Sequence, residues 1–113
     1  MLITRKKHKA AIQPVDKLVR GYLDYIKSVK EELTCSEISE TFRYSLCVAL
    51  GLETKGYSER VERLGVGAVA VLKDILDGEN LSGVDAEMKR GLLEACVLSI
   101  ESARKRVLEV RES

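Results

Sequence analysis

The sequence predicts an all-α protein: a small four-helix bundle-like domain with a long C-terminal helix and a short basic N-terminal segment. Apolar residues recur at steps of three and four along most of the chain, which is the spacing of a helix that buries one face. Capping residues and glycines interrupt this pattern at intervals, and no stretch alternates apolar and polar residues convincingly as a half-buried strand does. A hydrophobic content of 45% in 113 residues is sufficient for one modest core, and a charged content of 33% suits solvated outer faces.

Residues 1–13 form the predicted basic N-terminal segment, and residues 14–113 form the single helical domain. Positions 1–20 hold six basic residues and one acidic residue, a net charge of +5 in a chain whose total is +1. Pro14 is the only proline, and proline suits the first turn of a helix because its missing N–H would have no partner there. We therefore predict a helix that begins at Pro14 and ends near Glu32.

The second predicted helix has the clearest start signal in the chain. Thr34 and Glu37 match the T-x-x-E capping box, in which each side chain accepts a hydrogen bond from the other residue's backbone N–H. Leu33 and Ile38 flank the box as a hydrophobic staple. We predict a helix over residues 35–50, followed by Gly51 as the glycine that terminates it.

The third predicted helix begins after Ser58, which is a favourable N-cap residue, and ends at Gly78. Its buried stripe is predicted from apolar residues at helical spacing, with further flanking contacts from Val66, Val69 and Leu76. The stripe consists of Val61, Leu64, Ala68, Leu72 and Ile75. The loops are short, which favours antiparallel packing of helices that are neighbours in the sequence.

The fourth predicted helix lies within the stretch from about Leu81 to Val110, with Ser82 and Asp85 as a second, weaker capping box. Apolar residues alternate steps of three and four along it, the a/d pattern of a helix–helix seam. This seam consists of Leu93, Cys96, Ile100, Ala103, Val107 and Val110. Additional apolar residues, Leu92, Val97 and Leu98, predict that its first half is buried on more than one side. We expect every other helix to pack against it.

Two motif matches lack the structural context that their function needs. The run from Gly65 to Ala70 fits the dinucleotide-binding pattern G-x-G-x-x-A, but that motif requires a preceding strand, and the residues before Gly65 have helical spacing. Ser36 to Leu52 aligns with a helix-turn-helix, but the segment that would read DNA bases contains only apolar side chains and Cys47. We interpret the first match as close helix packing and the second as one continuous buried helix.

Candidate catalytic and metal-binding groups are isolated. His8 is the only histidine and has no nucleophile or carboxylate at a readable spacing, and the three cysteines show no C-x-x-C pattern. An odd number of cysteines without a signal peptide indicates a reducing, cytoplasmic setting. No apolar run approaches the roughly 18–20 residues that cross a bilayer. We expect no enzymatic activity, cofactor, metal ion or membrane partner.

The predicted function is protein–protein binding by a non-enzymatic cytoplasmic protein that forms a homodimer. A terminal helix of almost thirty residues spans about 40 Å, too long for its neighbours to cover, so its later apolar residues are the predicted interface. These residues are Ile100, Ala103, Val107 and Val110. The alternative is a small nucleic-acid-binding regulator that contacts phosphates through two basic clusters. Those clusters consist of Arg5, Lys6, Lys7, Lys9, Arg104, Lys105 and Arg106.

Overall fold

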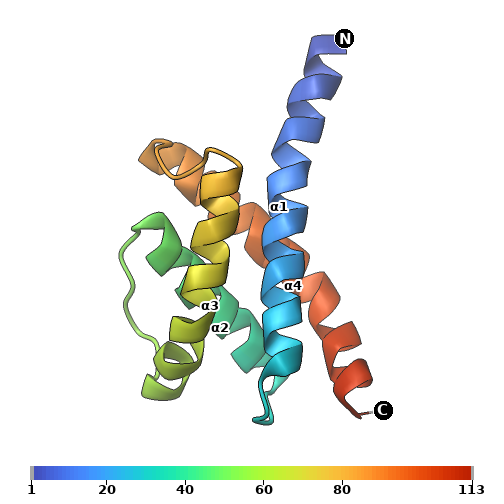
Figure 1. Cartoon of the computed structure of the whole chain (residues 1–113), viewed down its shortest axis with the longest axis vertical. Helices are drawn as coiled ribbons and strands as arrows, with labels where there is room; N and C mark the ends of the chain where they lie inside the picture. The colour runs from blue at the N-terminus through green and yellow to red at the C-terminus, as the bar shows by residue number, and fades with distance from the viewer. Residues whose placement is uncertain (1, 113) are drawn as a thin grey trace.

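The computed structural model describes the backbone of residues 2–112 and the side chains of residues 14–103. Four helices account for most of this backbone (Figure 1), and no strand occurs between residues 2 and 112. The helices are α1 (Leu2–Ser28), α2 (Cys35–Leu50), α3 (Glu59–Gly78) and α4 (Ala86–Glu112). The predicted all-α fold is therefore confirmed.

The four helices are arranged in two layers. Viewed as in Figure 1, α1 and α3 lie side by side in front, and α2 and α4 lie behind them. α2 packs most extensively on α3, and close pairs are also formed by α2 with α4, α1 with α3, and α1 with α4. Consecutive helices α1 and α2 therefore lie diagonally across the bundle, as do α3 and α4.

This arrangement corrects two expectations about helix packing. Short loops were expected to make sequence neighbours into antiparallel pairs, but only α2 and α3 are close neighbours, and they run in the same general direction (Figure 1), with Arg60 at the start of α3 bound to Glu37 at the start of α2. The terminal helix was expected to contact every other helix, whereas α4 packs on α1 and α2 and forms no comparable pair with α3. A helix in a four-membered bundle has two adjacent neighbours, and the third lies across the core.

The predicted start and end of the first helix were wrong. Pro14 lies inside α1, which begins at Leu2, and the helix ends at Ser28 instead of continuing to Glu32. An internal proline removes one backbone hydrogen bond but does not by itself stop a helix, because flanking turns can continue on both sides. The apolar spacing continued as far as Leu33 because Leu33 belongs to the staple that precedes α2.

The ends of α2 are as predicted. The Thr34 side chain accepts a hydrogen bond from the Glu37 N–H over 3.1 Å, and the Glu37 carboxylate accepts one from the Thr34 N–H over 3.0 Å. Gly51 closes the helix in the left-handed conformation, at φ 76°. Leu33 and Ile38, the predicted staple, are both buried in the core.

The junction between α3 and α4 uses different residues from those predicted. Ser58 caps α3 by accepting a hydrogen bond from the Val61 N–H, as expected. At the other end α3 finishes at Gly78, as predicted, and the left-handed residue after it is Asn80, at φ 58°. The box of Ser82 and Asp85 does not form: Ser82 hydrogen-bonds to Asp77, while Asp85 accepts a bond from the Met88 N–H and precedes α4 directly.

Tyr22 of α1 lies at the centre of the core. It is fully buried, its ring centroid is 4.7 Å from that of Phe42, and its hydroxyl donates a hydrogen bond of 2.7 Å to the Ile38 carbonyl. Burial raises the pKa of this phenol well above its usual value, because the charged form would be desolvated. The contacts join α1 to α2 across the diagonal of the bundle.

Two glycines of α3 make room for tyrosine rings from the neighbouring helices. A Cβ added to Gly65 would lie 2.5 Å from Cδ2 of Tyr44, and one added to Gly67 would overlap the hydroxyl of Tyr25. The Tyr25 hydroxyl in turn donates a hydrogen bond of 3.2 Å to the Leu64 carbonyl. The Gly-x-Gly run thus serves close packing inside a helix, in agreement with the interpretation from the sequence.

Two arginines in the first turns of α3 hold the loop between α1 and α2. Arg60 binds the Glu37 carboxylate through Nε and donates to the Glu32 carbonyl. Arg63 forms two hydrogen bonds of 3.1 Å with the two carboxylate oxygens of Glu31. Hydrogen bonds and ion pairs from α3 therefore hold the loop that connects α1 to α2.

Candidate functional site

A run of nine residues in the middle of α3, from Leu64 to Leu72, contains no polar side chain. Nine residues make two and a half helical turns, so an uncharged run of this length covers the whole circumference of the helix, including its solvent side. The solvent-facing residues are defined here as the α3 patch. They are Val66, Gly67 and Ala70, which are exposed, and Val69, which is half-buried.

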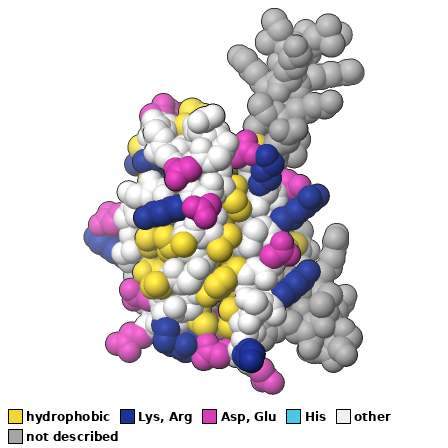
Figure 2. Space-filling model, viewed as in Figure 1, with side chains coloured by type: hydrophobic (Ala, Val, Ile, Leu, Met, Phe, Trp, Pro, Cys, Tyr) yellow, Lys and Arg dark blue, Asp and Glu magenta, His cyan; other side chains and the backbone are white. Residues whose placement is uncertain are grey.

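Figure 2 shows hydrophobic side chains gathered on this face, over α3 and along its seam with α1. Val66 is 64% exposed, among the highest values for a large hydrophobic residue in the described part of the chain. The sequence prediction that Val66 adds flanking contacts to the core was wrong, because its side chain lies opposite the buried stripe. Surface helices usually place charged or polar groups there.

Charged residues border the α3 patch at both ends. Glu62 precedes it by one turn, and Lys73 and Asp74 follow it by one turn; all three side chains are exposed. No ion pair involves any of these three among the described side chains. Arg63, beside Glu62, is held by Glu31.

A second exposed apolar surface lies on α4. Leu98 is 67% exposed and Met88 is 56% exposed, with the exposed small residues Gly91 and Ala95 between them. The sequence prediction that Leu98 widens the buried stripe was wrong. Leu93 and Cys96 are buried against α1 and α2, and the helical twist turns Leu98 away from both.

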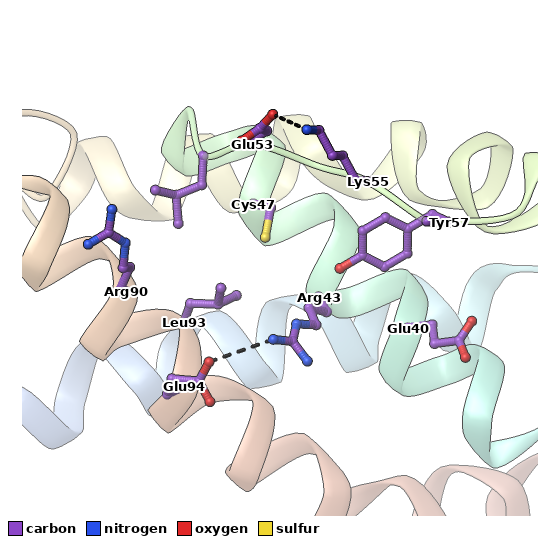
Figure 3. A pocket seen from close by; sticks show the side chains of 11 residues that line it. Glu40, Arg43, Cys47, Glu53, Lys55, Tyr57, Arg90, Leu93 and Glu94 are labelled. Atoms are coloured by element: carbon purple, nitrogen blue, oxygen red, sulfur yellow. Dashed lines mark ion pairs between the residues drawn. The ribbon is translucent and has the colours of Figure 1, made fainter.

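A groove of about 740 Å³ opens between α2, the loop that follows it, and α4 (Figure 3). Its apolar floor is formed by Leu52, Leu93 and the Cys47 thiol. The charged groups that line it are equal in number and opposite in sign. They are Arg43, Lys55 and Arg90 on one hand and Glu40, Glu53 and Glu94 on the other.

The charges of the groove are partly paired with one another. Arg43 Nη2 lies 3.7 Å from Glu94 Oε1, and Lys55 Nζ lies 3.0 Å from Glu53 Oε1; dashed lines in Figure 3 mark these ion pairs. Arg90 enters from α4 without an ion pair among the described residues. A balanced set of exposed charges gives the groove no strong field toward an anionic or a cationic ligand.

The cysteines are free, and two of them are buried in packing positions. Burial raises the pKa of the Cys47 thiol, and it raises that of the Cys96 thiol to about 12. Nucleophilic attack by cysteine requires the thiolate, so both shifts lower the reactivity of these thiols at neutral pH. Cys35 is half-buried at the start of α2.

The structure places only two of the residues predicted to form the protein interface. Ile100 is fully buried in the core of the single chain, and Ala103 is half-buried. Val107 and Val110 lie outside the described side chains, and so do all the predicted phosphate contacts. Those are Arg5, Lys6, Lys7, Lys9, Arg104, Lys105 and Arg106.

The α3 patch could have been found from the sequence, because an uncharged run longer than two turns must expose apolar residues on any surface helix. The groove had no such signal, since its residues come from two helices and a loop. Across residues 14–103, no three His, Cys, Asp or Glu side chains are grouped so that they could hold a metal ion. No helix in the described part of the chain is both long and apolar enough to span a membrane.

These features define the class of protein: a small all-α helical bundle with apolar surface exposed on α3 and on α4. No family model, curated protein or solved structure matches this chain.

Proposed function

We propose that this protein is a non-enzymatic protein-binding module whose main docking surface is the α3 patch, and that its partners include a second copy of itself. The observation that carries this proposal is the exposure of Val66 within a run of nine uncharged residues on a surface helix. Contiguous exposed apolar surface bordered by charged residues is typical of protein interaction sites.

The shape of the patch also supports helix packing against a partner. Ala70 leaves little side-chain bulk beside Val66 and Val69, so another helix could approach α3 closely. The groove between α2 and α4 is a weaker candidate, because its charges are balanced and several are already paired. Burial of the patch would remove Val66 from water without desolvating a charged group.

The test compares two variants that place a glutamate at equally exposed positions. Val66→Glu puts a charge in the α3 patch, and Leu98→Glu puts one on α4 as the matched control. Both sites are exposed, so each change should alter the free energy of unfolding by less than about 0.5 kcal/mol. Circular dichroism and thermal unfolding check that both variants are folded.

Each chain is then used as bait in affinity capture from cells of the native host. A second copy of the chain with a different tag is added, so that self-association is detected in the same experiment. We expect wild type and Leu98→Glu to retain the same partner and Val66→Glu to lose it. If Val66→Glu captures the same proteins as wild type, the α3 patch is not the docking surface.

A further inference from the structure

We infer that a second copy of this chain covers the α3 patch, with the two α3 helices antiparallel about a two-fold axis near Ala68. This inference rests on the proposed function and adds the orientation in which the second copy binds the α3 patch. The evidence is the position of the charged residues at the two ends of the patch. The two-fold rotation brings each of these charges opposite a charge of the other sign on the second copy.

The first complementary pair is Glu62 and Lys73. The two residues are eleven positions apart, about 16 Å along the helix, and their midpoint lies beside Ala68. At 3.6 residues per turn they project on the same side of Val66. A two-fold axis perpendicular to α3 therefore brings Glu62 of each copy opposite Lys73 of the other.

The second pair is Arg63 and Asp74, which are also eleven positions apart and share nearly the same midpoint. They project on the other side of Val66, so the same rotation places them opposite one another along the second edge of the patch. Arg63 already binds Glu31, and for this reason Glu62 and Lys73 form the principal contact. Neither of these two has an ion-pair partner among the described side chains of its own chain.

A parallel pairing of the two helices is less favourable. Lys73 and Asp77 lie close to the centre line of the patch. If the two helices ran in the same direction, the two-fold axis would place Lys73 opposite Lys73 and Asp77 opposite Asp77, so that like charges would meet. In the antiparallel pairing Lys73 meets Glu62 instead. The like charges of Glu59 and Asp77 then face one another only at the ends of the interface, where crossed helices diverge.

The experiment measures the dimer dissociation constant by sedimentation equilibrium at low salt for four chains. They are wild type, Glu62→Lys, Lys73→Glu and the double variant that carries both changes. We expect each single reversal to weaken the dimer about tenfold or more, because two like-charge contacts replace two attractive ones. The double variant restores both contacts, so its dissociation constant should return to within about threefold of wild type.

Leu98→Glu is the control and should leave the dimer unchanged, while Val66→Glu should abolish it. A parallel pairing sets each residue opposite its own copy, so reversal exchanges one like-charge contact for another; single variants that dimerise as tightly as wild type would therefore overturn the antiparallel arrangement. A wild type that is monomeric at about 100 μM would overturn self-pairing altogether. In that case the proposed function is decided separately, by whether Val66→Glu loses a different partner in the affinity capture.

Discussion

Thr34 and Glu37 exchange two hydrogen bonds across the first turn of α2, and Arg60 from α3 binds the same Glu37 carboxylate. The capping box was predictable because both of its residues lie within four positions of one another. The arginine was not, because it reaches Glu37 from 23 positions further along the chain. Local hydrogen bonds leave a pattern in the sequence, whereas contacts made by folding do not.

The Glu37 carboxylate should make the stability of the protein depend on pH. Hydrogen bonds from the Thr34 backbone, and then from Arg60, hold its pKa below the usual 4.5. A carboxyl with a lowered folded-state pKa contributes stability above its unfolded pKa and loses it as pH falls through the folded value. The contribution should therefore be complete at pH 6 and decline progressively below about pH 4.5.

Glu37→Gln tests this directly, because glutamine can still accept the capping hydrogen bond but does not titrate. Urea unfolding between about pH 3 and pH 7 should show a flatter stability profile for the variant, with the larger loss of stability at neutral pH. Glu31, whose pKa Arg63 also lowers, titrates in both proteins and provides the internal reference. Identical stability profiles for wild type and variant would mean that protonation of Glu37 does not contribute to the pH dependence of stability.

Two glycines at helix ends should respond oppositely to alanine. Gly51 has φ 76°, where a Cβ is strained, so Gly51→Ala should destabilise the protein by about 1–2 kcal/mol. Gly78 is helical with open space around it, so Gly78→Ala should stabilise by about 0.5–1 kcal/mol. Chemical denaturation measures the change in the free energy of unfolding for both variants. A loss of stability in Gly78→Ala would show that α3 ends before residue 78.

At the scale of the helices, periodicity predicted which face of α2 and α3 is buried but not what happens on the other face. The stripe of α3 is buried at Val61, Leu64, Ala68 and Leu72, as expected. The exposed apolar residues were misassigned at Val66 and Leu98, because an apolar residue beside a stripe can lie on either of its edges. Only the position of the neighbouring helices decides between them.

The close approach of Tyr44 to α3 gives a prediction for that interface. Gly65→Ala would place a methyl group against the Tyr44 ring, which also packs on Tyr57 at a centroid distance of 5.3 Å, so we expect a loss of about 1–3 kcal/mol. Gly91→Ala in α4 is the matched control: its added methyl meets open space and should stabilise by up to about 1 kcal/mol. Equal effects in thermal or urea unfolding would contradict the packing described at Gly65.

At the scale of the whole molecule, the number of helices was predictable from caps and periodicity, but their arrangement was not. Each pattern concerns one segment, and the diagonal placement of α1 and α2 depends on contacts between segments. Tyr22 illustrates the difference, because its spacing indicated burial, whereas its hydrogen bond to Ile38 and its contact with Phe42 arise only in the assembled bundle. The same holds for the groove, which no single segment forms.

The burial of the cysteines makes their labelling a measure of how often the bundle opens. At about pH 8 a thiol reagent should modify the half-buried Cys35 first, and Cys47 and Cys96 at least about tenfold more slowly. Denaturant should remove the difference, because all three thiols then have ordinary pKa values. Equal native rates at all three sites would contradict the assignment of Cys96 to the core.

The diagonal placement of consecutive helices has a consequence for the integrity of the chain. All four extensively packed helix pairs join a helix before the loop at 51–58 to a helix after it, and within the first half α1 meets α2 through the contacts of Tyr22 with Phe42 and Ile38. Peptides 1–54 and 55–113 should each show little helix by circular dichroism, and an equimolar mixture should recover the spectrum of the intact chain. The polypeptide link between α2 and α3 would then be dispensable, with the halves acting as complementary subunits of one core.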